Sequence, residues 1–309
     1  MNEHIPFRVR PMLATLVREP FDKPGWVYEE KYDGYRILAY KEGAAVTLMS
    51  RNAHDRTETF AAVAQGVAAL PFRTLLLDGE VVVFDSRGVS RFQLLQNLKA
   101  QPQYAVFDCL YKDGRDLRAK PLSARRAALD QILPSSRPNA TVFTSAILSL
   151  NGLAAFALAR RKGFEGVVAK DDSAPYIEGR SRRWLKFKVH QEDEFLIIGY
   201  TAPAGSRKHF GALLLGAYDR GRLSYVGKVG TGFTRESLAS LLQAFQPLVV
   251  SHALVANPPQ ERNVTWLTPR LVAQIAFEEL TTDHKLRQSV FLGLRDDKRP
   301  RDVIMPEAK

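Results

Sequence analysis

The spacing of the strand-length apolar runs changes near residue 190, and this change constrains the fold more than any other feature. Before Lys188, helical segments separate runs rich in Val, Leu, Phe and Tyr, which are typical of strands. These runs are Arg36–Tyr40, Ala45–Met49, Leu75–Phe84, Tyr104–Leu110 and Gly166–Lys170. After Lys188, short strands follow one another across Gly-rich turns, at Glu194–Tyr200, Ala212–Asp219 and Leu223–Val229. We predict two domains, residues 1–190 and 191–309, with the boundary near Val189–Asp193.

Two helices are predicted in the first domain from their end signals. Ser123 can cap a helix over Ala124–Leu133. Asn151 can cap a second helix over Gly152–Lys162, and the glycine that follows can end it. Strands mixed with helices in this way predict an α+β domain.

The second domain reads as a small β-barrel. A helix around Thr234–Phe245 follows the first three strands, and two further strands lie within Arg270–Leu280. About five short strands with one helix fit an oligonucleotide-binding (OB) fold. Gly227–Gly232 has the look of a phosphate-binding glycine loop, but its spacing matches neither the P-loop nor the dinucleotide motif. We interpret it as a strand end and turn, with Lys228 a candidate contact to DNA backbone.

Charge and cysteine content narrow the function classes. The chain carries 44 Lys and Arg against 33 Asp and Glu, a formal net charge of +11. Such a balance favours polyanionic partners, although scattered solvated basic side chains would give the same number. Cys109 is the only cysteine, which excludes an internal disulfide and a cysteine-rich zinc site, and its apolar neighbours predict a buried thiol. No signal-peptide core or membrane-length apolar run occurs. We therefore expect a cytoplasmic, nucleoid-associated protein.

Lys31 opens the pattern Lys-Tyr-Asp-Gly-Tyr-Arg at the end of the strand-like run Trp26–Glu30. The pattern places an amine beside a tight turn. A surface lysine that leads into an ordinary β-turn would have the same sequence. The motif by itself therefore suggests a reactive lysine without establishing one.

The remaining residues supply what such a lysine needs in order to attack a phosphate. A lysine must be neutral to act as a nucleophile, and a free lysine at pH 7 is protonated. Lys186 and Lys188 are two residues apart on a predicted strand and therefore share a face, where their charges can lower the pKa of a nearby lysine and hold phosphate. Arg51 would add to both effects. A triphosphate also requires a divalent metal bound by carboxylate oxygens, for which Glu165 and Asp33 are the candidates.

Seven segments follow one another in a fixed order along the chain. They are Lys31–Arg36, Ser50–Asn52, Leu77–Glu80, Tyr104–Tyr111, Glu165–Lys170, Trp184–Lys188 and Leu286–Lys298. Each of the middle segments is weak evidence by itself. Glu165-Gly-Val-Val, for example, is also typical of a buried strand. Together they resemble the covalent nucleotidyltransferases, and most closely the ATP-dependent DNA ligases of the bacterial end-joining group, the LigD ligase domain and its stand-alone relatives. The resemblance implies a nucleotidyltransferase domain of ATP-grasp-like antiparallel sheets and helices, followed by an OB-fold domain.

The resemblance also implies a role for each matching residue. Lys31 would be adenylylated by ATP, with Mg²⁺ or Mn²⁺ as the metal. Glu29 and Phe107 would contact adenine, Arg36 and Glu80 the ribose, and Arg51 the phosphate or the nick. Lys186 and Lys188 would bind phosphates, and Glu165 and Asp33 would bind the metal. Arg295, Asp297 and Lys298 would orient the leaving pyrophosphate. Glu29 is preferred to the adjacent Glu30 because the family carries this carboxylate two residues before the lysine. Phe107 would otherwise be interpreted as a core phenylalanine.

The implied function is the sealing of nicked duplex DNA in DNA repair by a monomer. End joining with a Ku-like end-binding partner and excision repair both stay open. An RNA ligase or a GTP-using capping guanylyltransferase is the alternative enzyme, and a basic adaptor built on a degenerate ligase is the non-enzymatic one. The starting Met and the charged tail favour a complete chain.

Two positions depart from the family pattern. Ala53 replaces the glycine that usually follows Ser-Arg-Asn, and at positive φ an alanine costs about 1 kcal/mol. Gln288-Ser289 replaces the usual residue and proline after Arg287. The loop around each departure is therefore expected to differ locally from the family.

Overall fold

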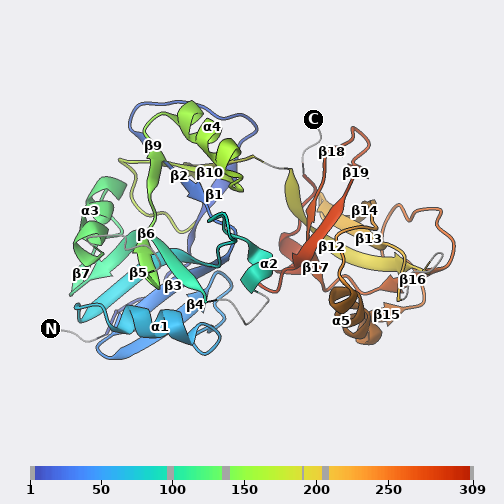
Figure 1. Cartoon of the computed structure of the whole chain (residues 1–309), viewed down its shortest axis with the longest axis horizontal. Helices are drawn as coiled ribbons and strands as arrows, with labels where there is room; N and C mark the ends of the chain where they lie inside the picture. Colours follow the sequence, from blue (N-terminus) through green and yellow to red (C-terminus); the bar gives the residue numbers. More distant parts are fainter. Residues whose placement is uncertain (1–3, 96–100, 134–139, 190, 204–208, 307–309) are drawn as a thin grey trace. The chain divides into compact units, whose positions relative to one another are not determined.

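The computed structural model describes residues 4–95, 101–133, 140–189, 191–203 and 209–306 and divides the chain into two compact units, Met1–Val189 and His190–Lys309 (Figure 1). Mostly antiparallel sheets combine with helices, which confirms the predicted α+β class. Among the described residues, no helix has the length and apolar character to cross a membrane.

The first sheet of unit 1 has five strands in the order β1-β11-β10-β2-β9, and all its neighbours are antiparallel except β1 and β11. The strands are β1 (Met12–Leu16), β2 (Trp26–Lys31), β9 (Ile147–Ser149), β10 (Gly166–Asp171) and β11 (Gly179–Lys188). Helix α4 (Gly152–Lys162) packs Ala155 and Ala159 against one face of this sheet, on Trp26 and Tyr28. The opposite face carries the polar side chains described below.

The second sheet of unit 1 has the order β4-β3-β5-β6-β7, with β8 added parallel to β6. Its strands are β3 (Tyr35–Glu42), β4 (Ala45–Ser50), β5 (Thr74–Val82), β6 (Gln103–Lys112), β7 (Arg115–Asp116) and β8 (Val142–Thr144). One face packs on α1 (Ala61–Ala68) and α3 (Leu122–Ile132), near the short α2 (Phe92–Leu95). The other face shares a core with the first sheet, in which Phe107 of β6 meets Trp184 of β11.

The two predicted helices of unit 1 had different outcomes. Asn151 caps α4 by accepting a hydrogen bond from the Ala154 amide at 2.9 Å, and Gly163 ends the helix in the left-handed conformation, as predicted. The predicted cap at Ser123 is wrong, because α3 begins at Leu122 and its N-cap is Pro121. Proline holds an extended backbone there and needs no amide partner, so the helix can start two residues earlier than the serine suggests. Sequence reasoning also missed α1, β1, β8 and β9.

An ion pair between α3 and β6 is fully buried in unit 1. Arg125 donates to both carboxylate oxygens of Asp108, at 2.8 and 2.9 Å, and both side chains are 0% exposed. Arg125 Nη1 also donates to the carbonyls of Lys120 and Ala174, at 2.6 and 2.9 Å. Burial raises the pKa of Asp108 even though Arg125 acts in the opposite direction. The contacts join a helix, a strand and a loop through one guanidinium.

Unit 2 is built on a seven-stranded sheet in the order β14-β13-β12-β16-β15, with β17 pairing with β12 and β20. Its strands are β12 (Glu192–Thr201), β13 (Leu213–Asp219), β14 (Arg222–Val229), β15 (Val249–Val250), β16 (Val264–Leu267), β17 (Val272–Ala276) and β20 (Val290–Leu294). A separate hairpin pairs β18 (Glu279–Leu280) with β19 (Leu286–Arg287). Helix α5 (Arg235–Phe245) starts at a capping box on Thr234, and short 3₁₀ helices span Gln246–Leu248 and Pro300–Asp302. The predicted count of five strands is too low, because it omits β15 and β19, which have two residues each, and β16 and β20, which have four and five.

Ala53, the first departure from the family pattern, lies in the turn after β4, and its backbone has a positive φ. Ala53 has φ +60° and donates its amide to the Ser50 carbonyl at 2.9 Å. Gln288, at the second departure, has φ +50°. An L side chain is disfavoured at such angles, whereas glycine is not.

Ala53→Gly is therefore expected to raise the free energy of unfolding by about 1 kcal/mol. Ala53 is exposed, so the change removes no buried contact. Urea denaturation followed by circular dichroism measures the effect. The matched control is Ala69→Gly, at an exposed alanine with φ −73°, which should lower stability. Equal effects of the two substitutions would contradict the prediction.

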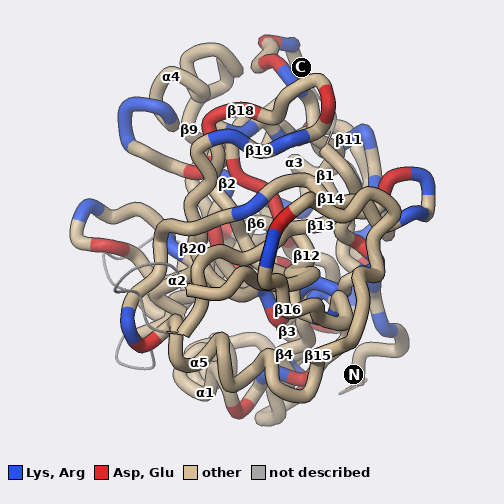
Figure 2. Tube along the Cα trace, turned by 90° about the vertical axis from the view of Figure 1, so that its right-hand side faces the viewer, with Lys and Arg blue, Asp and Glu red and all other residues tan. Residues whose placement is uncertain are grey.

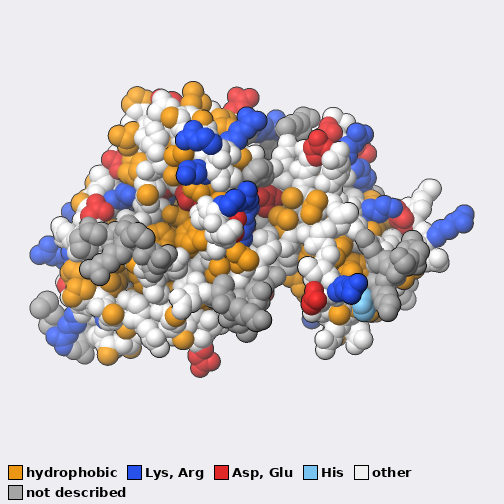
Figure 3. Space-filling view, in the orientation of Figure 1, with side chains coloured by type: hydrophobic (Ala, Val, Ile, Leu, Met, Phe, Trp, Pro, Cys, Tyr) orange, Lys and Arg blue, Asp and Glu red, His pale blue; other side chains and the backbone are white. Residues whose placement is uncertain are grey.

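The positive charge lies mainly on outer segments of both units. Figure 2 shows Lys and Arg on exposed loops and on β14 and β19 of unit 2. In unit 1 the last turn of α4 carries Arg160, Arg161 and Lys162. Figure 3 shows Lys and Arg side chains gathered over the part of unit 1 where α4 lies. Each unit therefore presents basic surface.

Candidate active site

Lys31 ends β2, and the strand register places it in a row with two residues of neighbouring strands. Gly166 of β10 pairs with Lys31 on one side and with Lys188 of β11 on the other. A Cβ on Gly166 would lie 2.3 Å from the Phe187 carbonyl oxygen, so only glycine fits this position. The next row on the same face is Glu29, Val168 and Lys186. The two predicted phosphate-binding lysines thus lie on the face that carries Lys31.

Glu165 lies close to the three lysine side chains of this face, Lys31, Lys186 and Lys188. Lys31 Nζ donates a hydrogen bond to Glu165 Oε2, and the side chains are 18% and 9% exposed. Burial acts to raise the pKa of Glu165, but the positive charges of Lys31, Lys188 and Lys186 outweigh it and hold the pKa below its ordinary value. Glu165 is therefore a carboxylate at neutral pH, with three lysine side chains around it.

Glu29 lies deeper on the same face and is 2% exposed. Its Oε1 accepts from Arg126 Nη1 at 2.6 Å, and its Oε2 accepts from Lys170 Nζ at 2.9 Å and from Ser145 Oγ at 3.2 Å. Lys170 is also 2% exposed, and burial lowers its pKa. Arg126 and Ser145 belong to none of the seven segments, and sequence reasoning missed both. They come from α3 and from the segment after β8, far from Glu29 in the sequence.

Phe107 of β6 and Arg36 of β3 are the residues that the second sheet contributes to the candidate site. The Arg36 guanidinium carbon lies 4.4 Å from the Phe107 ring centre, and Lys170 Nζ lies 4.3 Å from it. Arg36 donates to both oxygens of Asp78, at 2.5 and 2.7 Å. Burial acts to lower the pKa of Arg36, but Asp78 outweighs it and raises the pKa. Glu80 of β5 pairs directly opposite Arg36 in the register.

Asp33 and Arg51 occupy loops at the ends of β2 and β4. Asp33 Oδ2 accepts from the Phe92 amide, and the Asp33 amide donates to Ser90 Oγ, both at 3.0 Å. These contacts tie the turn of the lysine motif to the start of α2. The structure brings Glu165, rather than Asp33, into contact with Lys31. No group of three or more His, Cys, Asp or Glu side chains suited to a metal ion occurs in the described ranges.

The predicted residues of unit 2 form a second set of ion pairs. Arg295 donates to both oxygens of Asp297, at 2.8 and 3.0 Å, and to Gln274 Oε1 at 2.9 Å. Burial acts to raise the pKa of Asp297, but Arg295 outweighs it and lowers the pKa. Lys298 Nζ lies 3.1 Å from Glu194 Oε1. Lys228, the candidate DNA contact, pairs with Glu261 at 2.5 Å.

Family models match both units. A model described as "ATP dependent DNA ligase domain" matches residues 11–188, and one described as "ATP dependent DNA ligase C terminal region" matches residues 206–298. The chain belongs to the ATP-dependent DNA ligase family. The predicted family and the OB-fold second domain are thereby confirmed.

Several relatives of this ligase-family chain align over nearly all of its length. The multifunctional non-homologous end joining protein LigD of Pseudomonas aeruginosa is 39% identical, with 97% of this chain and 37% of that protein covered. The corresponding LigD of Mycobacterium tuberculosis is 36% identical, with 95% and 39% covered. A solved structure of mycobacterial DNA ligase D complexed with ATP and MES is 34% identical, with a TM-score of 0.73 over 96% of this chain and 98% of that one. The chain thus spans about two fifths of the curated relatives' length.

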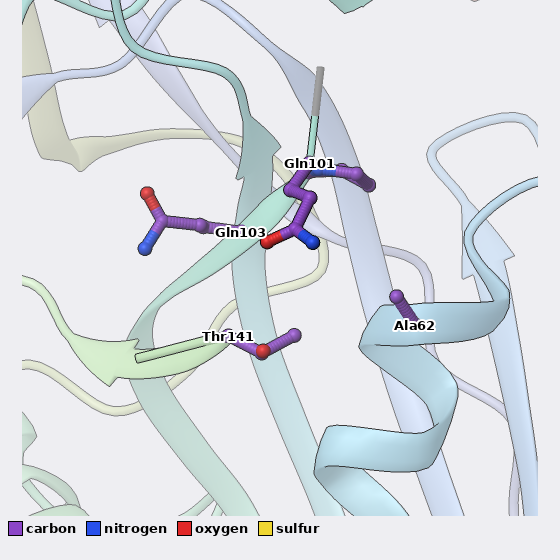
Figure 4. A pocket seen from close by; sticks show the side chains of 5 residues that line it. Ala62, Gln101, Gln103 and Thr141 are labelled. Atoms are coloured by element: carbon purple, nitrogen blue, oxygen red, sulfur yellow. The ribbon is translucent and has the colours of Figure 1, made fainter. Parts of the chain in front are cut away.

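A surface pocket of about 280 Å³ lies away from these residues in the ligase-family chain. Figure 4 shows Ala62 of α1 on one side, with Gln101, Gln103 and Thr141 on the other. All its lining residues are uncharged, and none belongs to the predicted site. The pocket is therefore separate from the predicted site residues.

Glu30, the carboxylate not chosen for adenine, is held in an apolar environment on the other face of β2. In the described parts of the chain its Oε1 is buried without a hydrogen-bond partner, and burial raises its pKa to about 8. The folded state therefore keeps this proton between pH 4.5 and about 8, whereas the unfolded chain loses it. Since the folded state binds more protons, this group makes stability fall as pH rises through that window.

Glu30→Gln is expected to flatten this fall and to stabilise the protein by about 2 kcal/mol above pH 8, because the amide carries no charge to desolvate. Denaturant titrations at a series of pH values measure the slope. The control is Glu58→Gln, at an exposed glutamate, which should leave the slope unchanged. An unchanged slope in Glu30→Gln would contradict the assignment.

Proposed function

We propose that this chain is an ATP-dependent DNA ligase that seals nicks in duplex DNA during repair, and that Lys31 is its nucleophile. The observation that carries the proposal is the hydrogen bond from Lys31 to Glu165, in register with Gly166 and Lys188. A lysine held beside an anion and two further cations is unusual for a structural role. It is the arrangement expected where an amine must meet a phosphate.

The first step is attack of the Lys31 amine on the α-phosphate of ATP. A nitrogen–phosphorus bond forms, the bond from the α-phosphorus to the bridging oxygen breaks, and pyrophosphate leaves with the electron pair. Lys186 and Lys188 would neutralise phosphate charge. Glu165 accepts a hydrogen bond from Lys31, and the amine attacks once one proton has passed to solvent. A second proton leaves the nitrogen for solvent as the nitrogen–phosphorus bond forms.

A divalent metal fits Glu165 in this proposal. The carboxylate is anionic, nearly buried and supplies hard oxygen ligands, as Mg²⁺ or Mn²⁺ prefers. A magnesium ion with one protein carboxylate keeps several waters and substrate oxygens as its other ligands. When bound, it would polarise the phosphate and template the in-line geometry. Asp33 is the weaker candidate ligand, since one of its oxygens already accepts a backbone amide.

The nucleotide would lie between the two sheets of unit 1. Glu29 and Phe107 are proposed to contact adenine, and Arg36 and Glu80 the ribose. Arg51 would contact phosphate or the nick. Arg295, Asp297 and Lys298 of the OB-fold domain would orient the leaving pyrophosphate.

Two further steps complete the reaction. AMP passes from Lys31 to the 5′-phosphate at the nick, and the 3′-hydroxyl then displaces AMP and joins the strand. The basic turn of α4 and the basic strands of unit 2 are candidate contacts to the DNA backbone. We propose a monomer, and both end joining with a Ku-like partner and excision repair are compatible with this chemistry.

The test combines nucleotide and nick specificity. The protein is incubated with Mg²⁺ and α-labelled ATP or GTP, and then with nicked duplexes that carry DNA or RNA ends. We expect a labelled adduct with ATP and sealing of the DNA nick. Adduct formation with GTP alone would indicate a capping-type enzyme, and sealing of RNA alone an RNA ligase. The absence of any adduct would favour the adaptor.

A further inference from the structure

Among the described residues, three donors contact the buried Glu29 carboxylate. They are Arg126 on Oε1 and both Lys170 and Ser145 on Oε2. An ionised carboxylate offers about four acceptor positions. Three are occupied from fixed directions, so one acceptor position on Oε1 remains for a ligand. Two of the three donors are cations that are 2% and 12% exposed, which makes their hold strong as well as directional.

Lys170 links Glu29 to the aromatic ring proposed to stack on the base. Its Nζ lies 4.3 Å from the Phe107 ring centre and 4.4 Å from the Trp184 ring centre, while it donates to Glu29. Cations attract aromatic faces at these distances. One ammonium group therefore fixes both the carboxylate and the ring relative to each other.

We infer that Lys170 and Arg126 are positioning residues that set nucleobase specificity by locking the single remaining acceptor of Glu29. The inference rests on the proposed function, in which Glu29 contacts the adenine amino group. A locked acceptor matches the 6-amino donor of adenine. It opposes the 6-carbonyl oxygen of guanine or hypoxanthine, because two acceptors then face each other.

The fixed position of the Glu29 carboxylate matters because a carboxylate that moves can accept a hydrogen bond from the wrong base. Guanine and hypoxanthine carry an N1–H donor next to the 6-carbonyl oxygen, and a carboxylate that shifts toward N1 can accept from it. Adenine has an acceptor at N1 and gains nothing from that shift. Removal of a clamping cation is thus expected to weaken ATP binding and to admit inosine triphosphate at the same time.

The experiment measures initial rates of adduct formation with ATP and with inosine triphosphate, which differ at position 6 and N1. Lys170→Met keeps an unbranched side chain that is one atom shorter and removes its charge. We expect the ratio of kcat/KM for ATP to that for inosine triphosphate to fall about tenfold or more, mainly through KM for ATP. Lys170→Arg retains a cation and should restore part of the ratio.

Lys41→Met is the matched control for burial. Lys41 is 4% exposed and donates to the carbonyls of Gly43 and Ala68, on strand β3 and away from Glu29. General loosening of the fold should lower both rates alike in this variant and leave the ratio unchanged. Arg126→Met provides the second test of the lock should Lys170→Met not fold, with the same direction expected.

The outcomes separate the two proposals. If wild-type protein forms an adduct with ATP but Lys170→Met and Arg126→Met retain the wild-type ratio, the specificity role is wrong and the ligase proposal stands. If wild-type protein forms no adduct with any nucleotide, the proposed function fails and this inference falls with it. A fall of the ratio in Lys41→Met equal to that in Lys170→Met would also overturn the inference.

Discussion

Lys31→Ala is expected to reduce formation of the labelled adduct from ATP by roughly 10⁴-fold or more, which in practice is a complete loss. Alanine offers no nucleophile, and it removes the amine that donates a hydrogen bond to Glu165. Lys186 and Lys188 lie on the neighbouring strand, where the proposal gives them phosphate binding and not attack. Gel analysis after incubation with α-labelled ATP and Mg²⁺ measures the result.

Two controls show that such a loss is local. Lys162→Ala removes an exposed lysine from the last turn of α4 and should form the adduct at the wild-type rate. Lys31→Ala itself should still join a nick that already carries AMP on its 5′-phosphate, since the last step uses the 3′-hydroxyl as nucleophile. Persistence of the label on Lys31→Ala would remove Lys31 from the mechanism.

Arg125→Met is expected to lower the free energy of unfolding by about 3–5 kcal/mol. The substitution keeps most of the side-chain volume but leaves Asp108 inside unit 1 without its cation, and the carbonyls of Lys120 and Ala174 without a donor. An isolated buried charge is far more costly than a missing surface pair. Urea denaturation followed by tryptophan fluorescence measures the change.

The comparison variants test whether the unpaired charge causes the loss. Arg299→Met breaks an ion pair with Asp302 whose side chains are 48% and 28% exposed, and it should cost less than about 1 kcal/mol. Asp108→Leu combined with Arg125→Met removes both charges and should be more stable than Arg125→Met alone. A double variant less stable than Arg125→Met would show that packing, and not charge, dominates at this position.

Sequence reasoning succeeded where the determining interactions are local or periodic. The ends of α4 depend on Asn151 and Gly163, which act within one turn. The shared face of Lys186 and Lys188 depends only on their two-residue spacing in a strand. The Ser123 cap failed because Pro121 offers a competing start that the helix uses.

The deeper part of the site could not be predicted because its contacts join distant segments. Arg126 and Ser145 reach Glu29 across 97 and 116 residues, and neither lies in a recognisable motif. The Lys31–Glu165 contact spans 134 residues, but the family resemblance identified both residues as site candidates. Pairwise contacts of this range follow from the strand order, which local patterns do not encode.

The parallel pairing of β1 with β11 has an evolutionary consequence. Residues 12–16 carry none of the seven motif segments, yet they flank the strand that bears both lysines proposed to bind phosphate, with Leu16 opposite Lys186. A gene fragment that started at the lysine motif would leave that strand as an open sheet edge. We therefore expect that recombination between longer polypeptides transfers a stable copy of this sheet only together with the strand that precedes the motif. The family model agrees, because its match begins at residue 11, well before Lys31.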